Sequence, residues 1–179
     1  MRLLVMKPVI KPLTPSTFDA AIALKVALWQ EELNGVFDHQ LSHEEEFAFY
    51  QRWAFEGIEP RPKVLGAYHG ETLVGAIFSS PAETADHPDG VEVNGLWVHP
   101  NTRHQGIAKK LLFAALKEES KRAVILYAHT YAPSYPMYLH LGGEVIKTLV
   151  QLEGRLHVSV FCFDRLRLLK KVGSFHASI

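Results

Sequence analysis

The sequence has little cysteine, no charge excess and no long hydrophobic run, and each absence excludes a class of protein. Its single cysteine, Cys162, cannot form an internal disulfide, so a reducing compartment is the simplest expectation. Basic and acidic residues both number 19, so the chain lacks the basic excess that is typical of general nucleic-acid binders. The N-terminal apolar run is too short for a signal peptide, and no segment approaches a membrane span. We therefore expect a soluble, cytoplasmic protein without nucleic-acid or membrane partners.

What the sequence does contain is enough apolar material for a sizeable core. Hydrophobic residues make up 47% of the 179 residues, which fits one domain spanning residues 1–179. Strand-like runs alternate with helical ones in the order β-α-α-β-β-β-α-β-α-β-β, without a strict βαβ repeat. This order predicts an α/β fold of the mixed α+β kind, with helices on both faces of a central mixed sheet of six to seven strands.

Two amphipathic helices are expected before residue 60. Ser16, with Asp19 three residues later, resembles a capping box for the first helix. Ser42 is the expected cap of the second helix. His39 and His43 are spaced as two metal ligands on one helical face, but no third ligand is spaced to join them. Exposed histidines are therefore the preferred interpretation, and no metal site is predicted.

The stretch VEVNGLWVHPNTRHQGIAKKLL, residues 91–112, places a basic turn with a glycine between a strand and a helix. A helix that begins directly after such a turn presents unpaired N–H groups and the positive end of its dipole, which suits a phosphate. Gly106 permits close approach of the backbone, Ala108 is nearly as open, and Arg103 and His104 add donors. On the residues alone, a pyrophosphate cradle and a purely structural tight turn are equally good interpretations.

The spacing Arg103-x-x-Gly106-x-Ala108, preceded by Leu96-Trp97-Val98-His99-Pro100 and followed by Leu111-Leu112, resembles the central motif of the GNAT (Gcn5-related) N-acetyltransferases. The order of elements along essentially the whole chain is similar to that of the family as well. The resemblance implies a GNAT-type acyl-CoA N-acyltransferase fold. It also implies an enzyme that takes acetyl-CoA as co-substrate and passes the acetyl group directly to a primary amine of a small molecule or peptide.

The resemblance further implies which residues hold the coenzyme. Backbone amides of the turn would grip the pyrophosphate. The strand edge at Leu96 and Val98 would pair with the pantetheine arm as with an extra strand, which requires that strand to splay from its neighbour. The implied coenzyme-binding residues are Leu96, Trp97, Val98, Arg103, His104, Gln105, Gly106, Ile107, Ala108 and Lys109.

Two side chains are implied to take part in the chemistry. An acceptor amine must lose a proton before it attacks, because an alkyl ammonium titrates near 10. Glu92 matches a position at which the family often carries a glutamate base, and a solvated carboxylate is the alternative. Tyr138 matches the tyrosine that often protonates the coenzyme thiolate, and a packing tyrosine is the alternative. The N–H of Val98 would polarise the thioester carbonyl.

The chain departs from the family pattern at two places. The segment after the fifth predicted strand lacks the frequent asparagine, and Gly142-Gly143 stands where a Gly-Phe pair is common. Tyr131 and Tyr135 are therefore alternative proton donors, and His129 is a candidate second base.

The acceptor remains open at this point. An acidic, aromatic rim in the first two helices and their connection would suit a cationic amine, although acidic residues also favour the first turn of a helix. The basic C-terminal tail predicts a last short helix or a subunit contact in a homodimer. Two rival functions are a coenzyme-binding module without catalysis and the same fold with another acyl donor or a hydroxyl acceptor. The rim consists of Glu31, Glu32, Phe37, Asp38, Glu44, Glu45, Glu46, Phe47 and Tyr50.

Overall fold

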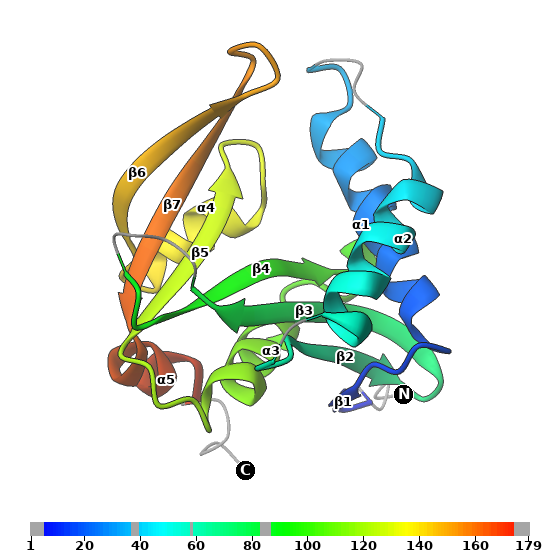
Figure 1. Cartoon of the computed structure of the whole chain (residues 1–179), viewed down its shortest axis with the longest axis horizontal. Coiled ribbons are helices and arrows are strands. Elements are labelled where there is room, and N and C mark those ends of the chain that lie inside the picture. Colours follow the sequence, from blue (N-terminus) through cyan, green and yellow to red (C-terminus); the bar gives the residue numbers. More distant parts are fainter. Residues whose placement is uncertain (1–5, 37–39, 58, 83–86, 174–179) are drawn as a thin grey trace, which may run out of the picture.

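The computed structural model of the chain describes residues 6–36, 40–57, 59–82 and 87–173. The order of elements agrees with the predicted one, with two short helical turns and a C-terminal helix in addition (Figure 1). The elements are β1 (Val9–Pro12), α1 (Phe18–Leu33), α2 (His43–Gln51), a π-helical turn η1 (Arg52–Glu56), β2 (Lys63–His69), β3 (Thr72–Pro81), β4 (Gly90–Val98), a 3-10 turn η2 (Pro100–Thr102), α3 (Ile107–Leu116), β5 (Ala123–His129), α4 (Ser134–His140), β6 (Glu144–Gln151), β7 (Leu156–Asp164) and α5 (Arg165–Gly173).

The strands form one mixed sheet of seven, in the order β1-β2-β3-β4-β5-β7-β6. Every neighbouring pair is antiparallel except β4 and β5, which run parallel. The predicted fold class, a mixed sheet with helices on both faces, is therefore confirmed. The parallel pair lies in the middle of the sheet, where the connection through α3 crosses from one strand to the next.

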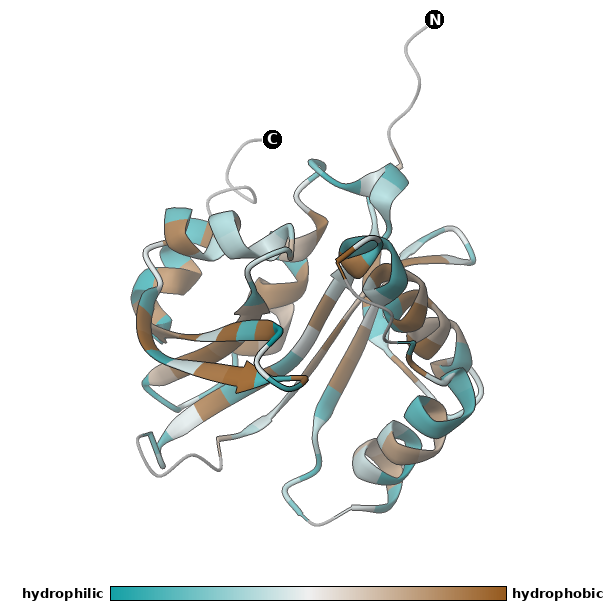
Figure 2. Cartoon of the chain, turned by 90° about the horizontal axis from the view of Figure 1, so that it is seen from above, coloured by the Kyte–Doolittle hydropathy of each residue, from teal (hydrophilic) through white to brown (hydrophobic). Residues whose placement is uncertain are grey.

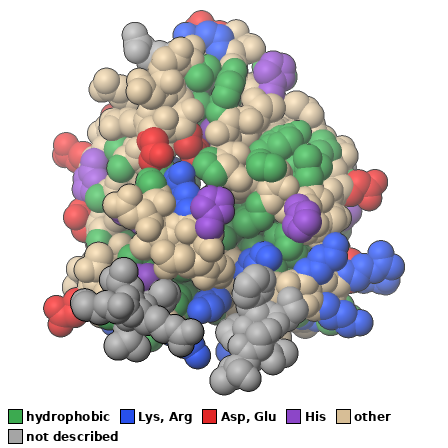
Figure 3. All heavy atoms as spheres, turned by 180° about the vertical axis from the view of Figure 1, so that it is seen from behind, with side chains coloured by type: hydrophobic (Ala, Val, Ile, Leu, Met, Phe, Trp, Pro, Cys, Tyr) green, Lys and Arg blue, Asp and Glu red, His purple; other side chains and the backbone are tan. Residues whose placement is uncertain are grey.

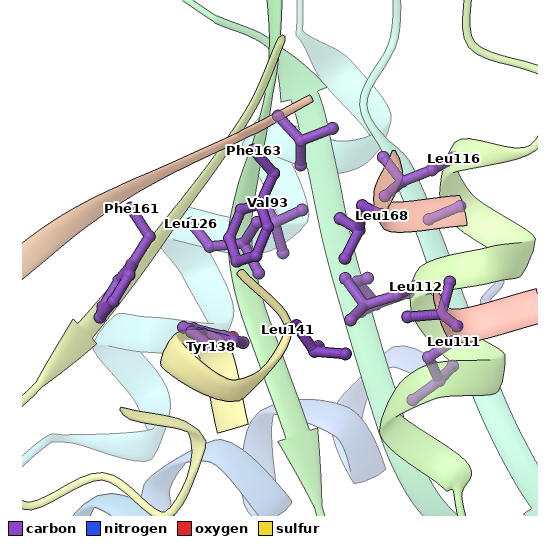
Figure 4. Packing of buried hydrophobic residues seen from close by; sticks show 14 of the residues in the cluster. Val93, Leu111, Leu112, Leu116, Leu126, Tyr138, Leu141, Phe161, Phe163 and Leu168 are labelled. Carbon is purple, nitrogen blue, oxygen red and sulfur yellow. The ribbon is translucent and has the colours of Figure 1, made fainter. Parts of the chain in front are cut away.

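Two apolar clusters hold the helices to the sheet. One joins α1 and η1 to β2 and β3, with Phe18 stacked on Phe78 at 5.2 Å between ring centroids. The other joins α3, α4 and α5 to the opposite face and contains the fully buried Leu111 and Leu112 (Figure 4). In Figure 2 the strands are mostly hydrophobic, whereas turns and the outer sides of helices are hydrophilic. The layers are thus α1 and α2, the sheet, and then α3, α4 and α5.

The parallel strands β4 and β5 pair over only part of their length. Their register runs from Gly90 opposite Ala123 to Val93 opposite Leu126. Beyond that point β4 pairs only with β3, and β5 continues against β7 as far as His129. The two strands visibly diverge in Figure 1. The splay that the family resemblance required is therefore present.

A β-bulge accompanies this divergence. Phe78 of β3 lies opposite Gly95, but the next residue, Ser79, lies opposite Val93, so Asn94 is the extra residue on β4. A bulge bends its strand and increases the local twist. The bulge therefore turns β4 away at the position where its pairing with β5 ends.

Helix caps were predicted with mixed success. Ser42 caps α2 as predicted, because its Oγ accepts a hydrogen bond from the N–H of Glu45 at 3.3 Å. The prediction for Ser16 was wrong. Helix α1 begins one residue later, after Thr17, whose Oγ1 accepts the N–H of Thr14 at 2.9 Å. The Oγ of Ser16 instead forms a hydrogen bond with the Oγ1 of Thr14 at 2.9 Å. The hydroxyl groups of this turn therefore bond one another and do not cap the helix.

The basic tail forms a helix, one of the two predicted alternatives. In α5, Leu168 and Val172 are buried and contact the cluster around α3, while Lys170 and Lys171 lie in its last turn. Residues 174–179 lie outside the described ranges. None of the described helices is both long and apolar enough to cross a membrane.

Candidate active site

The turn after β4 is held firmly to the sheet. The N–H of His99 bonds the carbonyl oxygen of Val74 on β3 at 2.8 Å, and the hydroxyl of Thr102 bonds the His99 carbonyl at 3.0 Å. Backbone N–H groups alternate in direction along a strand. Because the N–H of His99 points at β3, the N–H of Val98 points to the other side, into the gap between β4 and β5.

The backbone then takes two left-handed residues before α3 begins. His104 has φ of 62° and Gly106 has φ of 77°. Glycine adopts this conformation readily, whereas a side-chain-bearing residue pays for it in strain, which is typical of functional turns. Among the described residues, none places a side chain as a cap on the N-terminus of α3. The first N–H groups of α3 therefore face outward with the positive end of the helix dipole.

The other predicted coenzyme-binding side chains differ in what they contact. Ile107 is almost fully buried and anchors the first turn of α3 in the core. His104 and Gln105 are exposed, and Ala108 and Lys109 are half-buried. The turn thus combines one anchored residue with main-chain groups that remain near the surface.

Arg103 connects the turn to two other elements. Its Nε donates to the carbonyl oxygen of Val98 at 3.3 Å, and its Nη1 lies 3.7 Å from a carboxylate oxygen of Glu31 on α1. The guanidinium therefore braces the end of β4 against the first helix. The sequence pattern predicts a phosphate contact for this arginine, whereas the brace was not predicted.

The three residues at the end of β4 face both apolar clusters. Leu96 and Val98 pack against the α3 side, whereas Trp97 packs on the α1 side, edge-on to Phe78 at 4.8 Å between ring centroids. All three are half-buried. Their backbone therefore lies along the splayed edge while their side chains fix the strand from both faces.

Glu92 lies on the α1 face of β4, because its neighbours Val91 and Val93 point into the cluster on the opposite face. Its side chain is half-buried. Its carboxylate accepts a hydrogen bond from the hydroxyl of Tyr127 on β5. Burial, together with this hydrogen bond and the carboxylate charge, raises the pKa of Tyr127 well above its ordinary value. Tyr127 therefore stays protonated at neutral pH and remains a donor to Glu92.

Tyr138 lies on the other face of the sheet. It is only 2% exposed and packs against Phe161 and Phe163, with ring centroids 5.5 and 6.2 Å away (Figure 4). Burial raises the pKa of its hydroxyl well above the ordinary value, the hydrogen bond with Ser134 lowers it, and the charge of Glu32 raises it further. The hydroxyl is therefore a neutral donor over the physiological range.

The alternative tyrosines are placed differently. Tyr131 is 49% exposed on the surface after β5. Tyr135 is half-buried, and its hydroxyl oxygen lies 3.4 Å from the Oγ of Ser159 on β7. Of the three candidate donors, only Tyr138 is fully enclosed.

His129, the last residue of β5, is engaged at both ring nitrogens. Its Nε2 lies 2.8 Å from a carboxylate oxygen of Glu32 on α1, and its Nδ1 accepts the N–H of Tyr131 at 3.2 Å. Both residues were candidates from the sequence, but their pairing was not predicted. Tyr127 and His129 alternate with the buried Leu126 and Ala128, and that alternation was the signal that could have placed them together on the α1 face.

The predicted acidic rim is partly neutralised. Glu46 forms an ion pair with Lys25, whose ammonium also lies 4.4 Å from the ring centroid of Tyr50. Glu44 and Glu45 are exposed in the first turn of α2, where they favour the helix dipole. Phe37 and Asp38, the remaining rim positions between the helices, lie outside the described residues.

Only one of the two spaced histidines belongs to the described residues. His43 lies 3.2 Å from a carboxylate oxygen of Asp19, and His39 lies outside the described residues. Within the described ranges, no group of three or more histidine, cysteine or acidic side chains is arranged to hold a metal ion.

A hollow of about 890 Å³ lies elsewhere, between β7, α5 and the start of β5. None of the predicted site residues lines it. Two of its charged residues pair across it, with Arg122 lying 3.8 Å from Asp164. Cys162 lines this hollow and is half-buried. Burial and the charge of Glu144 raise the pKa of its thiol, as expected for an unreactive cysteine.

Figure 3 shows the molecule from behind the view of Figure 1. Near the middle of this face, acidic side chains, a basic one and histidines lie close together beside exposed hydrophobic ones. Basic side chains gather along the lower right of the same view.

Comparison with known proteins agrees with this geometry. The model of the acetyltransferase (GNAT) family matches residues 26–142, which include β4, the turn, α3 and all of α4. No curated protein sequence matches the chain significantly.

Several solved structures share the fold at low sequence identity. PaiA N-acetyltransferase from Thermoplasma acidophilum, in complex with coenzyme A, is 19% identical with a TM-score of 0.66, covering 89% of this chain and 99% of that chain. YncA from Salmonella typhimurium, solved with its cofactor acetyl-CoA, is 18% identical with a TM-score of 0.61, covering 89% and 94%. The ribosomal-protein-alanine N-acetyltransferase from Brucella melitensis is 19% identical with a TM-score of 0.64, covering 87% and 99%.

These similarities extend over nearly the whole described fold, and the family match covers the elements that build the splayed gap and the turn. The chain therefore belongs to the acetyltransferase (GNAT) family, whose enzymes use acetyl-CoA as co-substrate.

Proposed function

We propose that this protein moves an acetyl group from acetyl-CoA to a primary amine of a small molecule or peptide, by direct transfer. The observation that carries the proposal is the conjunction of two features. Strands β4 and β5 part after Val93 and Leu126, and the uncapped N-terminus of α3 follows directly on the splayed strand. Family membership supports the same reading, since structures of similar fold were solved with acetyl-CoA or coenzyme A.

The turn residues would hold the diphosphate of the coenzyme through their backbone. The N–H groups of residues 104–109 lie at a helix N-terminus, which attracts phosphate through both hydrogen bonds and the dipole. Gly106 takes the left-handed conformation and carries no Cβ atom that would obstruct a ligand at the start of α3. In this proposal Arg103 adds a positive charge beside the turn and keeps β4 in place through Val98.

The edge of β4 would align the thioester. The N–H of Val98 points into the gap, where it can donate to the acetyl carbonyl oxygen, and Leu96 lies at the next position on the same edge. The bound coenzyme supplies the activated acetyl group. Trp97 fixes the strand from the α1 side by packing against Phe78.

Glu92 and Tyr138 would handle the protons from opposite faces of the sheet. An ammonium acceptor loses two protons as it becomes an amide. Glu92, on the α1 face, accepts the first proton, directly or through water, and then releases this proton to solvent. Tyr138 protonates the departing sulfur. The second proton leaves the attacked nitrogen and restores the hydroxyl of Tyr138. Overall, one of the two protons ends on the thiol and one in solvent.

Replacement of Glu92 by glutamine tests the base. We expect kcat/KM to fall by about 100-fold, because the amide cannot accept the proton, while the affinity for coenzyme A stays unchanged. Steady-state kinetics and calorimetric titration measure the two quantities, and Glu118→Gln, in the exposed turn after α3, is the control. Full activity of Glu92→Gln from pH 6 to 9 would reduce Glu92 to a hydrogen-bond partner of Tyr127.

Release of free thiol from acetyl-CoA, measured with a panel of primary amines, tests the function as a whole. A catalyst gives release that depends on the amine added. A coenzyme-binding module gives none at any pH from 7 to 9. Release with alcohols but not with amines would indicate a hydroxyl acceptor.

A further inference from the structure

Glu32 on the last turn of α1 carries a carboxylate that points at the sheet. Its side chain is 18% exposed, and its partner His129 at the end of β5 is 10% exposed. The two are separated by 97 positions in sequence and by 2.8 Å in space. This contact joins the first helix to the strand that borders the splayed gap.

The second contact of His129 fixes how its hydrogen is placed. The N–H of Tyr131 donates to Nδ1, so Nδ1 must keep its lone pair, and the ring hydrogen lies on Nε2. Nε2 then donates to Glu32. In this arrangement both ring nitrogens of His129 are engaged, and a carboxylate oxygen of Glu32 accepts from the ring. His129 is thereby a positioning residue, with no lone pair left to serve as the second base.

Apart from His129, the carboxylate of Glu32 has no basic partner among the described residues. Among the described residues, no lysine or arginine forms an ion pair with it, whereas Glu31 pairs with Arg103 and Glu46 with Lys25. A partly buried charge is costly unless it is paired. A cationic ligand would supply the missing partner.

Glu32 also lies close to the proposed reaction centre. His129 follows the point at which β4 and β5 part, and the charge of Glu32 acts on the hydroxyl of Tyr138. Two aromatic rings flank the imidazole, Trp29 at 6.1 Å and Tyr131 at 6.3 Å between ring centroids. An ammonium group at Glu32 would therefore have aromatic surface beside it, which favours cations.

We propose that Glu32, held in place by His129, binds the ammonium group of the acceptor. The acceptor is thus an amine that is cationic in solution and has an apolar body facing Trp29 and Tyr131. The inference rests on the proposed function, because it names the substrate class of that same site. A purely structural Glu32–His129 pair would instead only dock α1 on the sheet.

Equilibrium binding separates these two roles. The protein saturated with coenzyme A is titrated with alkyl and arylalkyl amines such as 2-phenylethylamine, and with the matching alcohols such as 2-phenylethanol. We expect wild type to prefer the best amine over its alcohol by about tenfold or more, as for a hydrogen bond to a charged group. Glu32→Gln keeps the shape and a hydrogen-bond acceptor for His129, and it should abolish this preference.

Kinetics gives a second readout. In Glu32→Gln and in His129→Ala, KM for the amine should rise about tenfold or more while the coenzyme affinity is retained. Glu118→Gln, in the exposed turn after α3, is the matched control and should behave as wild type.

Each outcome decides the inference. A wild-type protein that binds no amine better than its alcohol, or a Glu32→Gln variant that keeps the preference, overturns it. If the preference exists and depends on Glu32 but no amine yields free thiol, the ammonium site stands and the acetyltransferase proposal fails. If amines are acetylated equally well by Glu32→Gln, the proposed function stands and the ammonium site fails.

Discussion

Gly106→Glu is expected to abolish the binding of acetyl-CoA. Gly106 has φ of 77°, a conformation that costs an L-residue roughly 1–2 kcal/mol. A glutamate would also place its side chain and a negative charge next to the N–H groups that are proposed to receive the diphosphate. Both effects act against the same ligand, so we expect the affinity to fall by at least about 100-fold, the equivalent of roughly 2.7 kcal/mol.

Calorimetric titration with acetyl-CoA measures this loss. Gly154→Glu is the matched control, because Gly154 has φ of 85°, has no atom within 4 Å of an added Cβ, and lies in the turn between β6 and β7. It imposes the same backbone strain and the same added charge at a site remote from the turn. Micromolar affinity retained in Gly106→Glu would show that the diphosphate binds elsewhere.

Tyr138→Phe is expected to lower turnover by about 10- to 100-fold while the affinity for acetyl-CoA changes by less than about twofold. The substitution removes only the hydroxyl and keeps the ring packed against Phe161 and Phe163. Because burial raises the pKa of this hydroxyl, it stays protonated over the working range and can supply a proton to a departing thiolate. Loss of that proton affects the chemical step rather than binding.

Single-turnover kinetics measures the chemical step directly, so that slow product release cannot hide the effect. Tyr135→Phe is the control variant, since Tyr135 lies on the same helix and its hydroxyl contacts Ser159. An unchanged rate in Tyr138→Phe would make Tyr138 a packing residue. A large loss in Tyr135→Phe instead would move the proton donor to that position.

The strongly periodic parts of the fold were predictable from the sequence. The hairpin turns at Gly70 and Gly154 and the stop at Gly142 have positive φ in the structure, so local backbone chemistry specified them. The start of α1 was predicted wrongly because Thr14 and Thr17 compete with Ser16 for the same local hydrogen bonds.

The departure at Gly143 also has a physical reason. A Cβ atom at this position would lie 2.6 Å from Phe163 Cζ and 3.0 Å from Phe161 Cδ1. Two rings of β7 thus fill the space around residue 143 and leave no room for a side chain there. The sequence alone showed the missing phenylalanine but not the rings that replace its bulk.

The site was only half predictable. The turn at 103–108 can be recognised from the local spacing of its residues. In contrast, the pairs Glu32–His129 and Glu92–Tyr127 join residues that are 97 and 35 positions apart. Such contacts depend on the register of strands and on how a helix docks, which no local pattern encodes. The splay likewise depends on where pairing stops, at Val93 and Leu126.

A crystal structure with acetyl-CoA bound tests the central claim most directly. We expect diphosphate oxygens within about 2.7–3.2 Å of backbone N–H groups of residues 104–109, and the pantetheine arm along β4 at Leu96 and Val98. A coenzyme bound instead in the hollow beside α5, or a turn filled by the protein's own side chains, would contradict the account.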